Sequence, residues 1–443
     1  MGYSNYLIEA EDLAFDAIQE GIRRLLLDGL DVRITPVSRN KALIRRHILD
    51  AIGHQYPQID PWKYLASQGY SFSKVYPISD EDALTLLRHR SVGELDGKPV
   101  QAIALVAGVA WHLDRIQAPA AWALLGGPDA IAWACKVGQI DTGFAKHPAL
   151  GFRAGVTPWL DTAGARNFFN PDPQYNQERG DNTGADPFSG FSWGHGMRVS
   201  TSISGWHPNG DNGNAFYGVA PKVPHTIVRI DNCVLINDQQ DAFAQALNYL
   251  VDVVKVDVVN LSMGTFPAWL IPSAKAAVNN AYEKGVILVC AGGQYVAPVI
   301  APAASDRTIA VSATTNNDDQ LWATGSHGPE IDWSAPGVNI RKGTFDKASK
   351  AFIYEDGGDG TSYSAALSTG AAALWLTYHQ TSIDAQYGKT WQRVHAFKTL
   401  AKATAKRPAV WGDGIGGTGV LQIQSLLTAP LPAINAGMKE PPI

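Results

Sequence analysis

Five short apolar segments recur at wide intervals in this 443-residue chain. Each is apolar almost throughout, which is typical of strands that are buried on both faces of a parallel sheet. Apolar residues at helical spacing fill two of the intervals, at residues 240–254 and 273–284. Short strands that alternate with helices predict a doubly wound, mostly parallel α/β sheet. The five segments are residues 135–140, 225–230, 256–261, 286–291 and 308–313.

The sheet is expected to occupy one of three parts of the chain. We predict a smaller N-terminal domain over residues 1–108, the α/β domain over residues 109–428, and a Pro-rich, extended tail over residues 429–443. Between the first two segments of the sheet, residues 151–190 form a long polar insertion without periodicity, which predicts a surface loop.

The N-terminal part is predicted to be helix-rich. Apolar residues recur at helical spacing over residues 9–30 and again over residues 41–52. Ser79 before an acidic turn is a favourable N-cap for a third helix. Residues 100–109 have the apolar character of a strand.

Composition excludes several classes of protein. The net charge of −5 provides no basic surface for nucleic acid. No run of 18 apolar residues exists, so we expect no membrane span. The N-terminus lacks a basic region followed by an apolar one, which predicts a cytoplasmic protein without a secretory signal. The odd number of cysteines, three, without a CxxC motif argues against disulfides and zinc sites, and favours free thiols.

Three polar residues lie at the ends of predicted strands or helices, where α/β proteins place their active-site residues. Asp141 follows the first strand, in VGQIDTG, and active sites of open α/β sheets lie beyond the carboxyl ends of the strands. His195 stands between two glycines at the start of a predicted helix, and Ser362 begins a helix of small residues. Taken singly, each has a structural interpretation: a turn aspartate, a surface histidine and an N-cap serine.

Seven motifs in order resemble the subtilase family of serine proteases, from Trp111 to about Leu427. VGQIDTG, GHGMRVSTSISG and GTSYSAALSTGAAAL resemble the family's Asp, His and Ser blocks. VVNLSMG resembles its substrate-binding strand and VILVCAGGQ its oxyanion block. WHLDRIQAPAAWALLGG and TGSHGPEIDWSAPGVNI resemble the start of the mature enzyme and the stretch before the serine.

The resemblance implies a serine endopeptidase that acts on polypeptides and requires no cofactor. Ser362 would be the nucleophile, His195 its general base and Asp141 the residue that orients the histidine. The Ser362 backbone N–H and the Gln294 side chain would hold the oxyanion, although the family has Asn at this position. Substrate would add as a strand between two segments, and their glycines would leave room for the side chain before the scissile bond. The segments supply Ser262, Met263, Gly264, Ala291, Gly292 and Gly293.

Departures from the family pattern keep two other functions open. Gln294 is one methylene longer than Asn, Arg198 stands where a second histidine is usual, and Ala366 replaces a proline after the serine. A peptide-binding module with weak turnover is therefore one alternative. A transpeptidase or macrocyclase that uses the same acyl-enzyme is the other.

The resemblance also raises two expectations outside the triad. Residues 1–108 occupy the position of a propeptide, so this domain is expected to bind either its own active site or a regulatory partner. Asp172, Asp181 and Asp186 offer oxygen ligands for a structural calcium ion, and a solvated acidic loop is the alternative.

Overall fold

The computed structural model describes residues 5–9, 34–38, 41–45, 74–78, 110–169, 184–188, 192–211, 213–296, 298–316, 320–409, 411–412, 415–434 and 440–441. The chain divides into two compact units, Met1–Ala102 and Ile103–Ile443, and each is described by itself.

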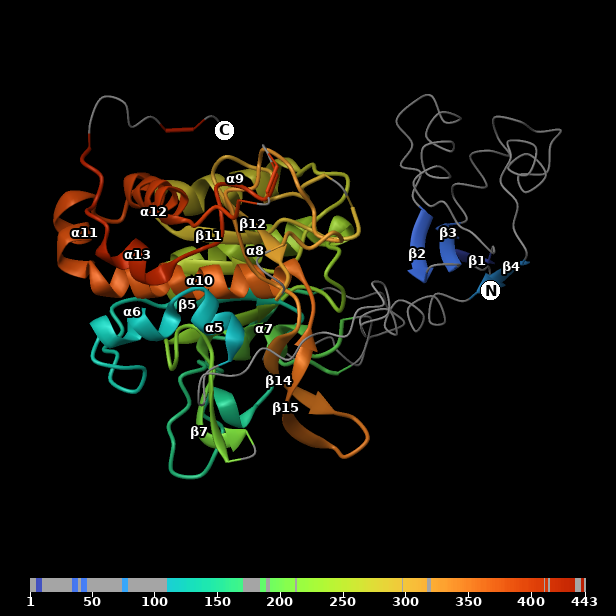
Figure 1. Cartoon of the computed structure of the whole chain (residues 1–443), viewed down its shortest axis with the longest axis horizontal. Helices are drawn as coiled ribbons and strands as arrows, with labels where there is room; N and C mark the ends of the chain where they lie inside the picture. The colour runs from blue at the N-terminus through green and yellow to red at the C-terminus, as the bar shows by residue number, and fades with distance from the viewer. Residues whose placement is uncertain are drawn as a thin grey trace. The chain divides into compact units, whose positions relative to one another are not determined.

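The described residues of the first unit form a four-stranded antiparallel sheet in the order β2-β3-β1-β4 (Figure 1). The helix expected from residue 41 is wrong at its start, because Lys41–Arg45 is strand β3 and pairs with β1 and β2. Short apolar runs fit both helical and strand periodicity, so this pattern was ambiguous. The other expected elements of this unit lie outside the described residues, apart from Glu9 in β1. The strands are β1 Asn5–Glu9, β2 Ile34–Ser38, β3 Lys41–Arg45 and β4 Lys74–Ile78.

The second unit is built on a seven-stranded sheet in which every pair of neighbours is parallel. The predicted doubly wound, mostly parallel sheet is confirmed, and so are all five predicted strands, within two residues at each end. Sequence analysis missed the two edge strands, β6 and β13. In sheet order the strands are β13 Trp333–Pro336, β12 Ile309–Thr314, β11 Ile287–Ala291, β10 Val258–Leu261, β5 Val137–Asp141, β9 His225–Arg229 and β6 Arg166–Asn167.

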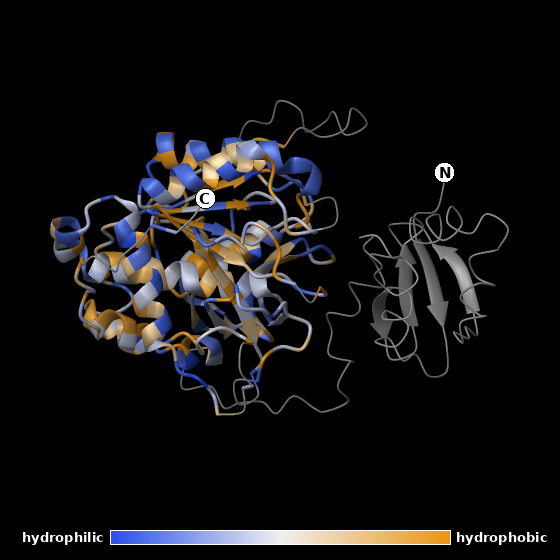
Figure 2. Ribbon diagram, turned by 90° about the horizontal axis from the view of Figure 1, so that it is seen from above, coloured by the Kyte–Doolittle hydropathy of each residue, from blue (hydrophilic) through white to orange (hydrophobic). Residues whose placement is uncertain are grey.

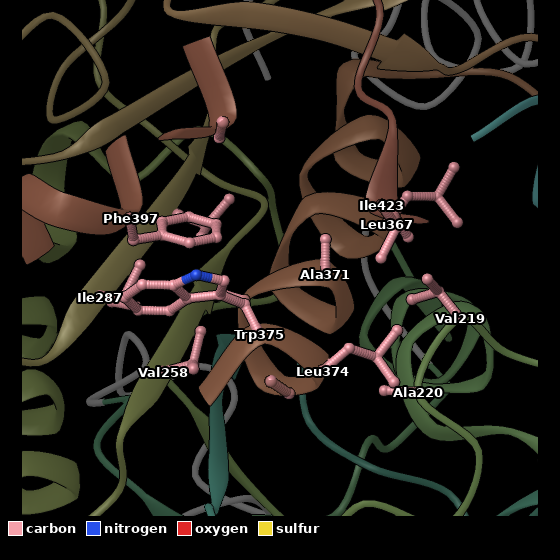
Figure 3. Close-up of a cluster of buried hydrophobic side chains, with 14 of the residues drawn as sticks. Val219, Ala220, Val258, Ile287, Leu367, Ala371, Leu374, Trp375, Phe397 and Ile423 are labelled. Carbon is pink, nitrogen blue, oxygen red and sulfur yellow. The ribbon is translucent and has the colours of Figure 1, made fainter. Parts of the chain in front are cut away.

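Helices cover both faces of this sheet because successive strand residues point to opposite sides. Val258 and Ile287 belong to the hydrophobic cluster that includes Trp375 of the long helix α10. Val259 and Leu288, their chain neighbours, belong to the second cluster, which helices α8 and α9 complete. Figure 3 shows Trp375 among Val258, Ile287 and Phe397, and Figure 2 shows apolar colour concentrated on the central strands.

The two predicted helices are confirmed as α8, Gln240–Tyr249, which continues as the π-helical turn η4 (Leu250–Val254), and α9, Pro272–Glu283. None of the helices in the described part of the chain has the length and apolar character that crossing a bilayer requires. The remaining helices are α5 Trp111–Arg115, α6 Ala118–Leu124, η1 Pro148–Leu150, α7 His195–Ser204, η3 Asn237–Gln239, α10 Thr361–Tyr378, α11 Gln380–Gln386, α12 Trp391–Thr404 and α13 Ile423–Thr428.

Two antiparallel hairpins, which the sequence did not predict, extend from the parallel sheet domain (Figure 1). One follows α7 and joins β7 (Trp206–Asp211) to β8 (Asn214–Tyr217). The other precedes α10 and joins β14 (Ile340–Asp346) to β15 (Ala351–Gly358). The three cysteines, Cys135, Cys233 and Cys290, are free, as predicted.

The order of the strands has a reversal at β5. The chain runs from β5 through β6 to β9 on one side of β5, then crosses through α8 to β10 on its other side. At such a switch point the two connections leave in opposite directions and open a crevice at the carboxyl end of the strand. Asp141, the last residue of β5, lies at this crevice.

Buried histidines make the stability of this unit depend on pH. Burial lowers the pKa of His225 from its ordinary value of 6.5 to about 3, while its Nδ1 atom lies 2.9 Å from Ser204 Oγ. The unfolded chain gains a proton at this site below pH 6.5, whereas the native chain stays neutral down to about pH 3. The free energy of unfolding therefore decreases as the pH falls through this range.

We predict a loss of about 2 kcal/mol from His225 alone between pH 7 and pH 5. Urea denaturation of the wild type and of His225→Gln at both pH values measures this contribution. The variant should have lower stability at pH 7 and a smaller loss on acidification. An equal loss in both proteins would contradict the assignment.

Candidate active site

Asp141 is fully buried, and both of its carboxylate oxygens accept hydrogen bonds. The Thr142 backbone N–H donates to Oδ1 at 2.8 Å, and Gln139 Nε2 donates to Oδ2 at 3.1 Å. Gln139 also donates to the Gly196 carbonyl oxygen, at 2.9 Å. The carboxylate is thereby held in one orientation from strand β5 itself.

His195 is the first residue of α7, and its ring faces Asp141. Gly194 before it has a φ of 66°, a left-handed conformation that lets the chain turn into the helix. His195 Nδ1 lies 2.7 Å from Asp141 Oδ1, and the histidine side chain is 14% exposed. Because a carboxylate can only accept, Nδ1 carries the hydrogen and Nε2 of the neutral ring is left as an acceptor.

Ser362 lies on the other side of this ring, in the first turn of α10. Its Oγ atom is 3.0 Å from His195 Nε2 and 3.4 Å from the Ser262 carbonyl oxygen. Ser262 Oγ in turn lies 3.1 Å from the Ser362 carbonyl oxygen. The structure thus brings Asp141, His195 and Ser362 into one hydrogen-bonded chain, with Ser262, the residue after β10, beside the serine.

Close packing of α7 against the end of β5 makes this chain of contacts geometrically possible. A Cβ atom built on Gly196 would lie 3.2 Å from Asp141 Cβ and 3.1 Å from Gly143 N, and it would overlap the Gly143 carbonyl oxygen. Glycine at position 196 therefore lets the helix approach the strand closely enough for the 2.7 Å contact of His195 with Asp141.

Asp186, which the sequence predicts only as a calcium ligand, links the end of β5 to the start of α7. Its Oδ2 accepts from Thr142 Oγ1 at 2.8 Å and from Gly194 N at 2.7 Å, while Oδ1 accepts from Phe188 N at 2.7 Å. Burial raises the pKa of this carboxyl. Asp186 thus fixes residues next to Asp141 and His195 in the chain.

The calcium site stays a prediction. Asp172 and Asp181 lie outside the described residues, and both oxygens of Asp186 already accept hydrogen bonds from the protein. Among the residues that the structure describes, no group of three or more His, Cys, Asp or Glu side chains could hold a metal ion.

Gln294 reaches the start of α10 beside Ser362. Its Oε1 accepts from the Thr361 backbone N–H at 3.0 Å. Because an N–H can only donate, this contact fixes the orientation of the amide and turns Nε2 away from Thr361. Within the described residues neither Nε2 nor the Ser362 backbone N–H donates to a protein group, so both remain available as donors.

The role of residues 262–264 and 291–293 in binding substrate stays a prediction. Strands β10 and β11 pair directly as far as Leu261 and Cys290, and the two segments begin where this pairing ends. Isoleucine side chains fill the places of the missing Cβ atoms: Ile300 at Gly264 and Gly293, and Ile331 at Gly292. The structure places the other three predicted residues as follows: Ser262 contacts Ser362, Met263 is buried in the second cluster and Ala291 ends β11.

Sequence reasoning missed Gln139 and Ile300 and gave Asp186 a different role. Gln139 carried a signal, because it is a polar residue inside an otherwise apolar buried strand, and buried polar groups need partners. Ile300 and Asp186 carried none, because each acts on residues that are distant in the chain.

Comparisons with known proteins agree with this geometry. A family model described as "Subtilase family" matches residues 134–423. Minor extracellular protease Epr of Bacillus subtilis is 32% identical over 233 residues, which cover 52% of this chain and 30% of that protein. An alkaline protease of Alkalihalobacillus alcalophilus is 30% identical over 300 residues, covering 67% and 66% of the two chains. Subtilisin BL of Lederbergia lenta is 31% identical over 274 residues, covering 60% and 83%.

A solved structure shares the fold. The crystal structure of MycP1 with the N-terminal propeptide removed superposes with a TM-score of 0.52 at 21% identity. The match covers 73% of this chain and 98% of that one.

Replacing Gly196 with alanine should separate α7 from β5 and break the contact between His195 and Asp141. A displacement of about 1 Å is expected to slow the reaction of Ser362 with a fluorophosphonate probe by about 100-fold. The control is Gly412→Ala, where the added Cβ would meet only Ile415 Cδ1 at 3.9 Å. Equal labelling rates for the two variants, measured by mass spectrometry, would contradict the packing argument.

Proposed function

Because the chain belongs to the subtilase family, we propose that it is a serine endopeptidase that hydrolyses peptide bonds through an acyl-enzyme on Ser362. The observation that carries the proposal is the continuous hydrogen-bonded chain from Asp141 through His195 to Ser362, with distances of 2.7 and 3.0 Å. The chain spans 30% of the Epr protease and 66% of the alkaline protease, so its activity as a whole protein is our proposal.

In the first step Ser362 Oγ attacks the carbonyl carbon of the substrate and His195 Nε2 accepts the hydroxyl proton. Asp141 stabilises the imidazolium that forms and holds the ring in place. His195 then donates the proton to the leaving amine, and the C–N bond breaks. Water attacks the acyl-enzyme with His195 again as the base, which releases the acid and restores Ser362.

Two donors are available for the oxyanion in each tetrahedral intermediate. The Ser362 backbone N–H lies at the start of α10, where helix N–H groups lack intrahelical partners. The Nε2 atom of Gln294 faces away from Thr361, whose N–H holds the other end of the amide at 3.0 Å. This fixed orientation supports glutamine as a working substitute for the shorter asparagine of the family.

The first test compares the wild-type full-length chain with Ser362→Ala on an unfolded protein substrate, with peptide release followed by mass spectrometry. Only the wild type is expected to release peptides. Cleavage by both would show that another group, or another protease, is responsible. Absence of cleavage by folded wild type that still binds peptides would favour the non-catalytic binding module.

Product masses also separate hydrolysis from transpeptidation. Hydrolysis adds one water to each bond that is cut, so the fragments sum to the substrate plus water. Joined or cyclic peptides, whose masses lack this water, would show that an amine outcompetes water for the acyl-enzyme and would contradict the hydrolase.

A second prediction concerns the oxyanion donor. Gln294→Leu removes the amide and should lower kcat by about 100- to 1000-fold with little change in KM, the range known for an oxyanion donor of subtilisin itself. Gln294→Asn keeps a donor on a shorter side chain and should lose less. Equal kcat for Gln294→Leu and the wild type would exclude the side chain from the oxyanion site.

We further propose that residues 1–108 are either a propeptide that binds the active site or a permanent domain that binds a regulatory partner. The mass of the N-terminus in active preparations distinguishes the two roles. Removal of this segment would support a propeptide, and an intact N-terminus on active enzyme would support a permanent domain.

A further inference from the structure

This inference rests on the proposed function. In that reaction the substrate residue before the scissile bond supplies the acyl group, so its side chain must lie beside Ser362. The reacting carbonyl lies at Ser362 Oγ with its oxygen toward Gln294. Two chain segments flank that position: Ser262 contacts Ser362 through two hydrogen-bond distances, 3.1 and 3.4 Å, and Gln294 contacts Thr361. Gly264 follows Ser262 by two residues in the first segment, and Gly293 directly precedes Gln294 in the second.

Ile300 fills the space between these two glycines. A Cβ atom on Gly293 would lie 2.8 Å from Ile300 Cγ2, and one on Gly264 would lie 2.8 Å from Ile300 Cγ1 and still nearer to Cδ1. Both ends of the isoleucine side chain are thus in contact with the segments that flank Ser362. Only 8% of the residue is exposed.

The backbone around Ile300 fixes this position from both sides. Ile300 N donates to the Gly292 carbonyl oxygen at 2.9 Å, and Ala304 N donates to the Ile300 carbonyl oxygen at 3.0 Å. The next residue, Ala301, accepts from Thr265 N at 2.8 Å. A large substrate side chain would have to displace a buried group whose main chain is tied to both flanking segments.

We propose that Ile300 determines specificity by restricting the residue before the scissile bond to glycine or alanine. Its branched side chain occupies volume that a Leu or Phe side chain would need, whereas a hydrogen or a methyl group requires no displacement. The substrate class is therefore polypeptides cut after small residues.

The test uses capped peptide p-nitroanilides that differ only in the last residue, which is Gly, Ala, Leu or Phe. The full-length wild type should have a higher kcat/KM for Ala than for Phe, by about 10- to 200-fold, the range for apolar pockets of different size. Ile300→Ala should raise kcat/KM for Phe by a factor in this range and change that for Ala only slightly. Ile300→Val, the milder truncation, should shift the ratio in the same direction by less.

Val299→Ala is the matched control. Val299 is the adjacent buried residue, and its Cγ2 would lie 3.4 Å from a Cβ on Gly328, away from the two glycines. Its truncation is expected to leave the ratio of Ala to Phe unchanged.

A fluorophosphonate probe reports the reactivity of Ser362 independently of the pocket. A wild type that cleaves after Phe as fast as after Ala overturns the inference, as does an Ile300→Ala variant whose ratio equals that of Val299→Ala. Labelling of Ser362 without cleavage after Gly or Ala overturns it as well. Absence of both labelling and cleavage overturns the proposed function and, with it, this inference.

Discussion

The contact of His195 Nδ1 with Asp141 Oδ1, at 2.7 Å, is the interaction around which the site is organised. It joins the end of the central strand β5 to the first residue of α7, and it decides which ring nitrogen is free to face Ser362. The parallel sheet makes the contact available, because β5 lies at the reversal of strand order and the segments that follow neighbouring strands meet at one edge. The contact also has a steric requirement, because only a glycine at position 196 lets the two segments approach this closely.

Several buried groups hold this contact without belonging to the triad. Gln139 reaches Asp141 from within β5, and Asp186 ties Thr142 to Gly194. In each of these hydrogen bonds an aspartate oxygen is the acceptor. The site is therefore positioned by hydrogen bonds to two aspartates, Asp141 at the end of the strand and Asp186 in the loop before α7.

The sequence predicted the sheet well because its strands are buried on both faces and therefore read as continuous apolar runs. β13 escaped notice because Trp333–Pro336 contains a serine and a proline and is only four residues long. The strand β3 was mistaken for a helix for a related reason, since five residues are too few to separate the two periodicities. The β14–β15 hairpin was not predicted because the loop between its strands contains no recognisable turn motif.

Chain order and local motifs predict which residues form the site, but they do not predict how the side chains are oriented. They placed Asp141, His195, Ser362 and Gln294 on the right segments, but not the direction of the Gln294 amide, which the Thr361 N–H determines. From the sequence, the glycines at 264 and 293 indicate room for a substrate side chain and do not reveal which residue packs against them. Ile300 could be identified only once the backbone brought it between them.

The most direct test of the account is the crystal structure of the Ser362 adduct with a peptidyl phosphonate. The phosphoryl oxygen takes the place of the oxyanion, so its surroundings report the arrangement on which the mechanism depends. We predict that it lies about 2.7–3.1 Å from both the Ser362 backbone N–H and Gln294 Nε2, with His195 still bound to Asp141. A phosphoryl oxygen directed into solvent, or a Gln294 amide turned away from it, would contradict the account.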